Sequence, residues 1–423
     1  MRKKKNAFTL IELLAVIVIL AVILVISIPR ILDVIETSKK DSFKNSAQLI
    51  ADTAEKKKVS DKLLGKDEEI NCKDVAKIND EDYKSCIITF DSDGNAKVSI
   101  TGRGKFKGLK ITNGTKENAE VKEITKPTYG MKATEYITNL LEYDEEGLKK
   151  DNTSDENIRY YGSNPNNYVS FNNELWRIIG VFGNNVKLVR KDSLGVLSWD
   201  SSESSVNDGL GVNEWSQSAL KNYLNTMYYG GTSVTCYGGS KNSTTTCPTN
   251  TIDEISKSLI DNHTWKTGAI ELSKSTNTLA FYKDERENVT GKRCSSRTSC
   301  NDTVERTTEW PGYIGLPYVT DWAYASSESI CETNMQKQDG PNSYICKNNN
   351  WMLKPNTLFW TISPNANDAP FYVWCAGGYY GGVCIRFASE ASSVFPAIYL
   401  KSNVLIESGK GTSDNPYILK AGS

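Results

Sequence analysis

One carboxylate, Glu12, lies inside a segment from Ala7 to Ile28 that is otherwise almost entirely apolar. At the centre of a membrane helix such a charge costs about 2.5 to 3.5 kcal/mol and usually has a partner. Removal of the residues before Phe8 would create a new α-ammonium group that the Glu12 carboxylate of a neighbouring copy can neutralise. The spacing therefore predicts two charges that are satisfied only on assembly. The alternative is that Glu12 lies near the membrane surface and is tolerated alone.

The ten cysteines are the second group able to do chemistry, and none occurs in the first 71 residues. The later part of the chain holds them in five close pairs, which is typical of disulfides in an oxidising compartment. Zinc is the alternative, but the chain has one histidine and no C-x-x-C spacing. Connectivity is not given by sequence, although short loop closure favours bonds between neighbours. The neighbour pairs are Cys72/Cys86, Cys236/Cys247, Cys294/Cys300, Cys331/Cys346 and Cys375/Cys384.

No catalytic constellation stands out in the chain. His263 is the only histidine, and its polar DNHTW setting predicts a solvated side chain. The sequence has no G-x-S-x-G motif, Ser/Lys pair or acid dyad, and every cysteine has a bonding neighbour that would remove it as a nucleophile. We therefore expect a protein that is not an enzyme and that uses no metal or cofactor.

The segment that carries Glu12 is long enough to span a bilayer, because 22 helical residues cover ~33 Å. Four basic residues, from Arg2 to Lys5, precede it. They are expected to hold that end in the cytoplasm and to place everything after Pro29 outside, in agreement with the cysteines. A secretory signal is the alternative, but its apolar region would be shorter and would end at a small-x-small cleavage site.

The stretch AFTLIELL, from Ala7 to Leu14, followed by an apolar run to Pro29, resembles the N-terminus of a type IV prepilin or pseudopilin. In that family a membrane peptidase cuts before a residue that is usually Phe and methylates the new amine. The resemblance thus implies cleavage between Ala7 and Phe8, N-methylation of Phe8, and pairing of Glu12 with the N-terminus of an adjacent subunit. Pro29 matches a proline that kinks the helix. Ala7 departs from the usual Gly, which implies slower or equivalent processing.

Beyond Pro29 an apolar stripe at helical spacing continues, so residues 8–58 are expected to form one stem helix. Next, CIITFDSDGNAKVSITG alternates apolar and polar residues around Asp93-Gly94, a pair suited to a tight hairpin turn. This predicts a small antiparallel sheet at residues 59–126, which the resemblance implies is packed on the outer half of the stem. A helical and polar linker is expected at residues 127–157.

The remaining residues, 158–420, are expected to form a second domain, because all nine tryptophans lie between Trp176 and Trp374. Strand-like segments such as ELWRIIGVF and FYVWC alternate with two helical segments and with loops rich in Gly, Ser and Asn. The chain is therefore predicted to be α+β, with a disulfide-stapled larger domain. That domain is similar to an uncharacterised domain of bacterial surface proteins, and a C-type-lectin-like arrangement is one fold to consider.

Two aromatic side chains are the candidates for ligand contact. Tyr379 and Tyr380 lie on a Gly-rich loop between Cys375 and Cys384, and aromatic rings on a rigid loop suit a glycan or protein ligand. The alternative is an ordinary turn beside a Trp-rich core. Nucleic acid is not an expected partner, because the net charge of -1 would become -5 without the four basic leader residues.

Together these features predict a minor or tip subunit of a surface filament, with a C-terminal binding or adhesion module. The large head favours the tip, since stacked helices leave limited room for each head. Its expected partners are other pilin subunits, the prepilin peptidase, a membrane assembly platform and a glycan or surface-protein ligand. The chain would be a single-pass membrane protein before assembly. A pseudopilin of a type II secretion or DNA-uptake machine is the alternative.

Overall fold

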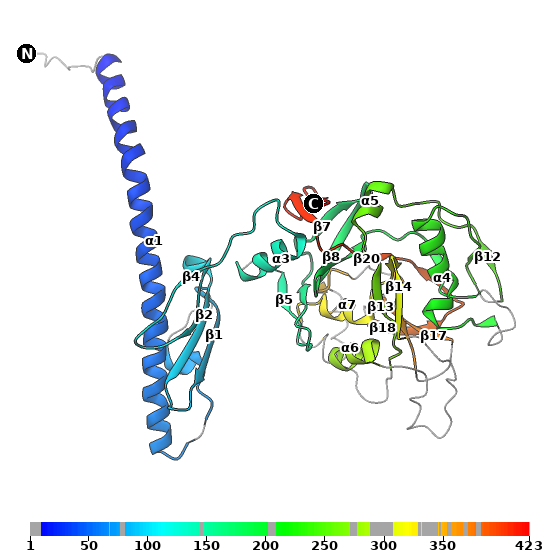
Figure 1. Cartoon of the computed structure of the whole chain (residues 1–423), viewed down its shortest axis with the longest axis horizontal. Coiled ribbons are helices and arrows are strands. Elements are labelled where there is room, and N and C mark those ends of the chain that lie inside the picture. The colour runs from blue at the N-terminus through cyan, green and yellow to red at the C-terminus, as the bar shows by residue number, and fades with distance from the viewer. Residues whose placement is uncertain are drawn as a thin grey trace, which may run out of the picture. The chain divides into compact units, whose positions relative to one another are not determined.

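The structure is a computed structural model of the whole chain, and it divides into two compact units, each with its own apolar core (Figure 1). The first comprises Met1–Lys126 and Glu142–Asp144, and the second Pro127–Leu141 and Glu145–Ser423. The residues that the structure describes are 10–66, 68–76, 81–143, 147–201, 209–239, 241–270, 277–287, 308–328, 331, 346, 348–352, 357–366, 371–377 and 382–422. The side chains of residues 12 and 24–27 also lie outside the described part.

One long helix, α1 (Leu10–Leu63), dominates the first unit, as the apolar stripe predicted. It continues through Pro29, where the missing N–H removes one backbone hydrogen bond, and it ends beyond the predicted limit at residue 58. From Phe43 onward one face is buried at helical spacing. The buried side chains of that face are Phe43, Ala47, Ile50, Ala51 and Ala54.

An antiparallel sheet in the order β1-β2-β3-β4 packs along the second half of α1, which confirms the predicted arrangement (Figure 1). The β1-β2 turn forms because Oδ1 of Asp91 accepts hydrogen bonds from the N–H groups of Asp93 and Asn95 at 3.1 and 2.9 Å. Gly94 supplies the positive φ of +85°. The elements are α2 (Cys72–Val75), β1 (Tyr83–Phe90), β2 (Ala96–Gly102), η1 (Gly104–Phe106), β3 (Leu109–Gly114) and β4 (Lys122–Glu123).

The second unit contains a large mixed sheet. Among the described residues nine strands form it, in the order β15-β20-β9-β8-β7-β22-β21, with β6 paired to β8 and β5 to β6. The central strands β8 and β9 are buried along most of their length, which explains their long apolar runs. The strands are β5 (Leu148–Lys150), β6 (Ile158–Tyr160), β7 (Tyr168–Phe171), β8 (Glu174–Phe182), β9 (Asn185–Arg190), β15 (Ile314–Gly315), β20 (Ala397–Tyr399), β21 (Leu405–Ser408) and β22 (Tyr417–Lys420).

A second sheet in this unit has the order β10-β19-β16-β17-β18 in the described part of the chain. Two short ladders, β11-β12 and β13-β14, lie outside both sheets. The strands are β10 (Val196–Ser198), β11 (Cys236–Tyr237), β12 (Thr244–Thr245), β13 (His263–Lys266), β14 (Glu309–Gly312), β16 (Leu358–Pro364), β17 (Tyr372–Gly377), β18 (Gly382–Phe387) and β19 (Ala391–Ser393).

Short helices complete the second unit and confirm its mixed α and β content. Ser218 and Asp253 cap α4 and α5, each side chain accepting a hydrogen bond from a backbone N–H of the first turn. The helices are α3 (Ala133–Glu142), η3 (Trp215–Gln217), α4 (Ala219–Asn222), the π-helical η4 (Tyr223–Tyr229), α5 (Glu254–Leu259), α6 (Thr278–Glu287) and α7 (Val319–Tyr324).

Tryptophan side chains fill the core of the second unit. Trp176, Trp360 and Trp374 are at most 2 % exposed, so their predicted core positions are confirmed. Further tryptophans join them in one continuous cluster that also includes residues from both large sheets. This unit therefore owes its stability mainly to buried aromatic area.

Residues 127–157 differ from the expected linker, because the structure assigns most of them to the second unit. Helix α3 buries Ala133, Tyr136 and Ile137 in the large core, and β5 pairs with β6. The polar stretch after α3 contributes Asp151, whose carboxylate is enclosed by hydrogen-bond donors rather than by water. Polar composition indicated a linker here because sequence does not distinguish a solvated carboxylate from an internally paired one.

Candidate functional site

The first half of α1 has no partner within the described residues. From Leu10 to Ile35, every side chain whose burial is described is exposed, including Val34 at 68 % and Val16 at 47 %. Its mean hydropathy reaches 2.9, and it is the one helix in the described residues long and apolar enough to cross a membrane. An apolar surface of this size is unfavourable in water, so this half requires lipid or other helices around it.

The predicted assembly residues fall at the start of this apolar half. Glu12 lies in the first turn of α1, between Ile11 and Leu13, which are 77 % and 56 % exposed. The Glu12 side chain lies outside the described part, as do Ala7 and Phe8. Pro29 lies within α1, at the position expected from the sequence. The described backbone thus places Glu12 in an apolar helical setting near the N-terminal end.

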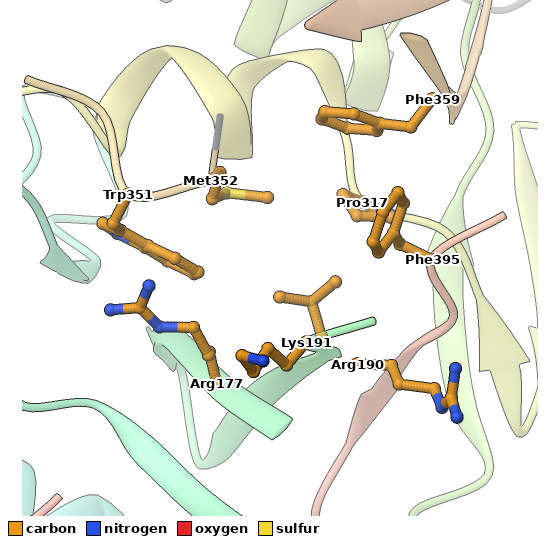
Figure 2. Close-up of a pocket in the computed structure, with 9 residues that line it drawn as sticks. Arg177, Arg190, Lys191, Pro317, Trp351, Met352, Phe359 and Phe395 are labelled. Carbon is orange, nitrogen blue, oxygen red and sulfur yellow. The ribbon is translucent and has the colours of Figure 1, made fainter. Parts of the chain in front are cut away.

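A small cavity in the second unit is lined by apolar side chains and by three basic residues, Arg177, Arg190 and Lys191 (Figure 2). Its volume of about 20 Å³ is enough for roughly one water molecule. The Arg177 guanidinium lies 4.2 Å from the Tyr168 ring centre and 4.6 Å from that of Trp351. Burial lowers the pKa of Arg177 to about 10. The cavity is too small for an organic ligand, so Arg177 serves here as a packed cation between aromatic rings.

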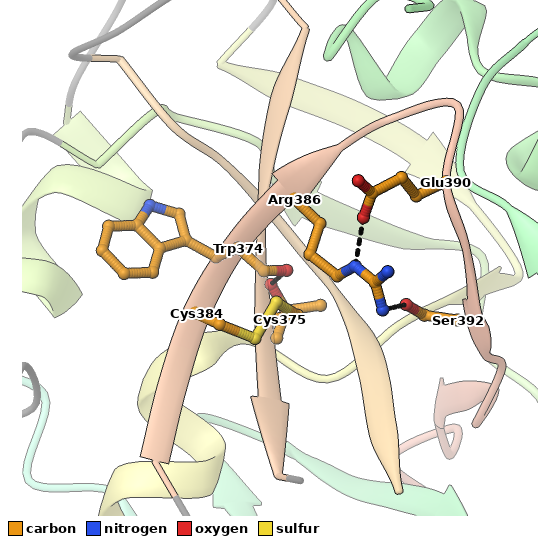
Figure 3. Close-up of a disulfide and its surroundings, with 7 residues drawn as sticks. Trp374, Cys375, Cys384, Arg386, Glu390 and Ser392 are labelled. Carbon is orange, nitrogen blue, oxygen red and sulfur yellow. Dashed lines mark hydrogen bonds and ion pairs between the residues drawn. A yellow bond between two sulfur atoms is a disulfide. The ribbon is translucent and has the colours of Figure 1, made fainter. Parts of the chain in front are cut away.

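Four of the five predicted cysteine pairs are bonded in the structure, and the described residues thus contain four disulfides. Cys294 and Cys300 lie outside the described residues. Figure 3 shows the bond between Cys375 on β17 and Cys384 on β18, with Trp374 directed away from it. Tyr379 and Tyr380, between these two strands, also lie outside the described residues. The bonded pairs are Cys72–Cys86, Cys236–Cys247, Cys331–Cys346 and Cys375–Cys384.

A model of the prokaryotic N-terminal methylation motif matches residues 2–28. The N-terminus is therefore of the type IV prepilin or pseudopilin kind. The match includes Ala7, Phe8 and Glu12 and ends just before Pro29. No curated protein and no solved structure matches the chain. The lectin-like arrangement of the second unit accordingly remains a prediction.

A motif of this kind implies processing by a prepilin peptidase and assembly with other pilins. It suggests a structural subunit, and it fits a membrane-anchored pilin that later enters a surface filament. The exposed apolar half of α1, which continues this prepilin-type N-terminus, is the part of the chain that such assembly would cover.

The second unit contains a buried charge network that sequence analysis did not single out. Arg159 on β6 contacts Asp151 through Nε at 2.8 Å and Asp321 on α7 through Nη1 at 2.7 Å. Lys187 on β9 contacts the second oxygen of Asp321 at 2.6 Å. All four side chains are at most 1 % exposed. The sequence signal is that Lys187 and Arg159 each lie between two apolar residues of their strand.

Close packing of two strands positions this network. Strand β6 approaches β8 at Gly180, where a Cβ would lie 2.0 Å from the Ile158 carbonyl oxygen. Only glycine allows that approach, which sets the position of the neighbouring Arg159. The N–H of Tyr318 donates to Oδ2 of Asp321 at 2.9 Å and fixes that carboxylate at the start of α7. Sheet and helix thus hold the charged groups in a defined geometry.

The pKa values of the network reflect burial opposed by charge. Burial lowers the pKa of Lys187 to about 8, although the Asp321 carboxylate acts in the opposite direction. Burial alone would raise the pKa of Asp321, but the charges of Lys187 and Arg159 outweigh it and lower that pKa. Burial would likewise lower the pKa of Arg159, and Asp321 with Asp151 raises it instead.

A further buried acid, Glu285 on α6, lies beside this network. Its carboxylate accepts hydrogen bonds from the hydroxyls of Thr320 at 2.5 Å and Ser363 at 2.8 Å. Arg286 Nη1 lies 3.3 Å from it. Burial raises the pKa of Glu285, against the opposing effect of Arg286. The two hydroxyl groups replace the hydrogen bonds to water that the Glu285 carboxyl group loses on burial. They also connect α6 to α7 and β16.

His263 is half-buried, so the predicted solvated side chain is wrong. Its ring stacks on that of Tyr399 with centres 3.7 Å apart, and Nδ1 lies 3.2 Å from Asp261 Oδ2. Burial lowers the pKa of His263 despite the Asp261 carboxylate. Polar neighbours in sequence indicated exposure, but β13 turns the ring toward the core. The contacts are those of packing, and among the described residues no group of His, Cys, Asp or Glu suits a metal ion.

Proposed function

We propose that this chain is a minor type IV pilin subunit at the filament tip, carrying a C-terminal binding module. The observation that carries the proposal is the methylation motif at residues 2–28 joined to a helix whose apolar first half is exposed. A soluble protein would not retain such a surface, whereas a membrane and then a bundle of like helices would cover it.

The processing step follows from the residues at the start of the motif. The peptidase would cut between Ala7 and Phe8, and methylation would then act on the Phe8 amine. The new N-terminus would lie in the apolar layer with the Glu12 carboxylate of an adjacent subunit beside it. Each charge is costly alone in hydrocarbon, and pairing offsets that cost. Partner recognition and membrane extraction would thereby be coupled through Glu12.

The size of the second unit supports the tip location. It comprises Pro127–Leu141 and Glu145–Ser423 and so exceeds the first unit in length. Heads of this size would crowd one another along a shaft whose subunits repeat at the spacing of stacked helices. The disulfides support a location outside the cytoplasm. In this proposal Tyr379 and Tyr380, on the loop closed by Cys375–Cys384, contact a glycan or a surface protein.

The pseudopilin alternative makes use of the same N-terminal motif and would place the chain in a type II secretion or DNA-uptake machine. The two functions differ in the cellular location of the second unit. Electron microscopy of cells labelled against the second unit distinguishes them: tip-associated label supports the proposal, and label confined to the membrane without filaments contradicts it. The assembled product should also begin at Phe8 with a methylated amine by mass spectrometry. A product that retains the first seven residues would contradict the processing step.

A further inference from the structure

Lys187 and Asp321 are in direct contact at a place that water does not reach. Lys187 Nζ lies 2.6 Å from Asp321 Oδ2, and both side chains are 0 % exposed. The two residues are 134 positions apart and come from β9, inside the large sheet, and from the short helix α7. A nitrogen this close to a carboxylate oxygen is also close to the carbon that bears it. The 2.6 Å contact is that of a charge-assisted hydrogen bond, and it holds the amine and the carboxyl group together as an intramolecular pair, for which proximity favours reaction.

The surroundings of Lys187 favour a neutral, nucleophilic amine. Aromatic rings enclose Nζ, the nearest being Tyr318 at 4.0 Å from its centre, followed by Trp265 at 5.1 Å and Tyr399 at 5.2 Å. Burial lowers the pKa of Lys187 to about 8, so the neutral form is far more accessible than in water. An amine attacks a carbonyl carbon only when it is unprotonated.

A fixed cation holds one oxygen of the Asp321 carboxyl group. Arg159 Nη1 donates to Oδ1 at 2.7 Å, which leaves Oδ2 on the side of Lys187. A guanidinium fixed on Oδ1 stabilises the negative charge that this oxygen gains when a nucleophile adds to the carbon. The fixed donor is already in place and needs no rearrangement during the reaction.

We propose that Lys187 and Asp321 are joined by an intramolecular isopeptide bond. A proton first passes from Lys187 Nζ to Oδ2 of Asp321 across their contact. The neutral Nζ then bonds to Cγ of Asp321, and the bond between Cγ and Oδ2 breaks. Of the three ammonium protons, one stays on the amide nitrogen and two leave with Oδ2 as water. The pair itself supplies every atom, and no oxidant, reductant or co-reactant takes part. The inference goes beyond the proposed filament role and does not depend on it.

The charge balance of the core favours this condensation. It removes one buried cation and one buried anion together, and burying each is costly. Arg159 keeps its contact with Asp151, and Arg286 keeps its contact with Glu285. The remaining buried charges therefore stay paired. The amide would connect the sheet to α7 over a far longer stretch of chain than the described disulfides, which span 9 to 15 residues.

Intact mass of the purified full-length chain tests the bond, after disulfide reduction and with the N-terminus determined separately. The expected mass is that of the sequence minus one water. Trypsin should leave Lys187 uncut and release residues 178–190 joined to residues 307–337 as one branched peptide. A chain at its full sequence mass, with Lys187 cleaved normally, would overturn the proposal.

Two variants test whether the mass deficit of one water comes from Lys187 and Asp321. Lys187→Met removes the amine while keeping a long apolar side chain, and its mass should show no deficit. Lys191→Met, at a partly exposed lysine just after β9, should keep the deficit of the wild type. A deficit that persists in Lys187→Met would place the missing water elsewhere and overturn the assignment. Should Lys187→Met fail to fold, the branched wild-type peptide alone decides.

Discussion

The two units place a carboxylate in an apolar setting in different ways. Glu12 lies on a helix whose described neighbouring side chains are exposed, and in the proposed assembly its cation comes from another molecule. Asp321 lies at the centre of the second unit, and its cations, Arg159 and Lys187, come from the same chain. In our proposal the first charge serves assembly between subunits, whereas the second is part of the fold. Each can be tested by removing one carboxylate.

The largest expected effect belongs to Glu12, the carboxylate proposed to pair between subunits. Glu12→Ala should abolish incorporation into filaments while leaving the chain in the membrane, because the charge pairing between subunits is lost and the apolar helix is not. The measurement is the amount of the subunit in sheared filaments relative to the membrane fraction. Glu36→Ala, an exposed acid on the same helix, is the matched control and should assemble normally. Equal assembly of both variants would contradict the comparison.

Removal of the internally paired carboxylate should instead affect stability. Asp321→Ala removes the partner of Lys187, ionic or covalent, and leaves Lys187 and Arg159 buried beside an unpaired position, which costs about 3 to 5 kcal/mol. Denaturant unfolding followed by tryptophan fluorescence measures the loss, because all nine tryptophans lie in the second unit. Asp192→Ala, whose side chain is 71 % exposed, should change the free energy of unfolding by less than about 0.5 kcal/mol. Similar losses in the two variants would contradict internal pairing.

Removal of the disulfide in the first unit should have a smaller effect on the free energy of unfolding, confined to that unit. Cys72 and Cys86 are 14 residues apart and tie α2 to β1. Replacing both by Ser should lower the free energy of unfolding of this unit by about 2 to 4 kcal/mol. Hydrogen exchange should rise in β1 and β2 while the tryptophan transition of the second unit stays in place. A shift of that transition would mean that the two units unfold together.

The same contrast explains what could be predicted from sequence. The long helix, the hairpin at Asp93-Gly94 and the neighbour disulfides follow local rules of spacing and turn chemistry, and the structure has them. The contact of Arg159 with Asp321 joins positions 162 apart, and that of Lys187 with Asp321 joins positions 134 apart. Such pairs depend on how the sheets pack, which no local pattern encodes.

Burial was the other property that sequence described poorly. His263 and Asp151 have polar neighbours along the chain, and composition therefore predicted solvent exposure and a linker. In the structure the His263 ring stacks on Tyr399, and Asp151 pairs with Arg159 inside the second unit. Polar composition reports only the residue type, whereas exposure is decided by the elements that pack around it.

The smallest effect concerns the pH dependence that Glu285 gives the second unit. Burial raises its folded-state pKa above that of the unfolded chain, so the folded state binds the extra proton. Its contribution to stability is full below the unfolded pKa, near 4.5, and is lost as pH rises through the folded value. Glu285→Gln does not ionise and still offers an oxygen to Thr320 and Ser363. As pH rises from 4 to 7 the unfolding free energy of the wild type should therefore fall relative to that of the variant, with a slope of at most about 1.4 kcal/mol per pH unit, the limit set by one proton. A pH-independent difference would show that Arg286 and the hydroxyl donors fully offset the burial of this acid.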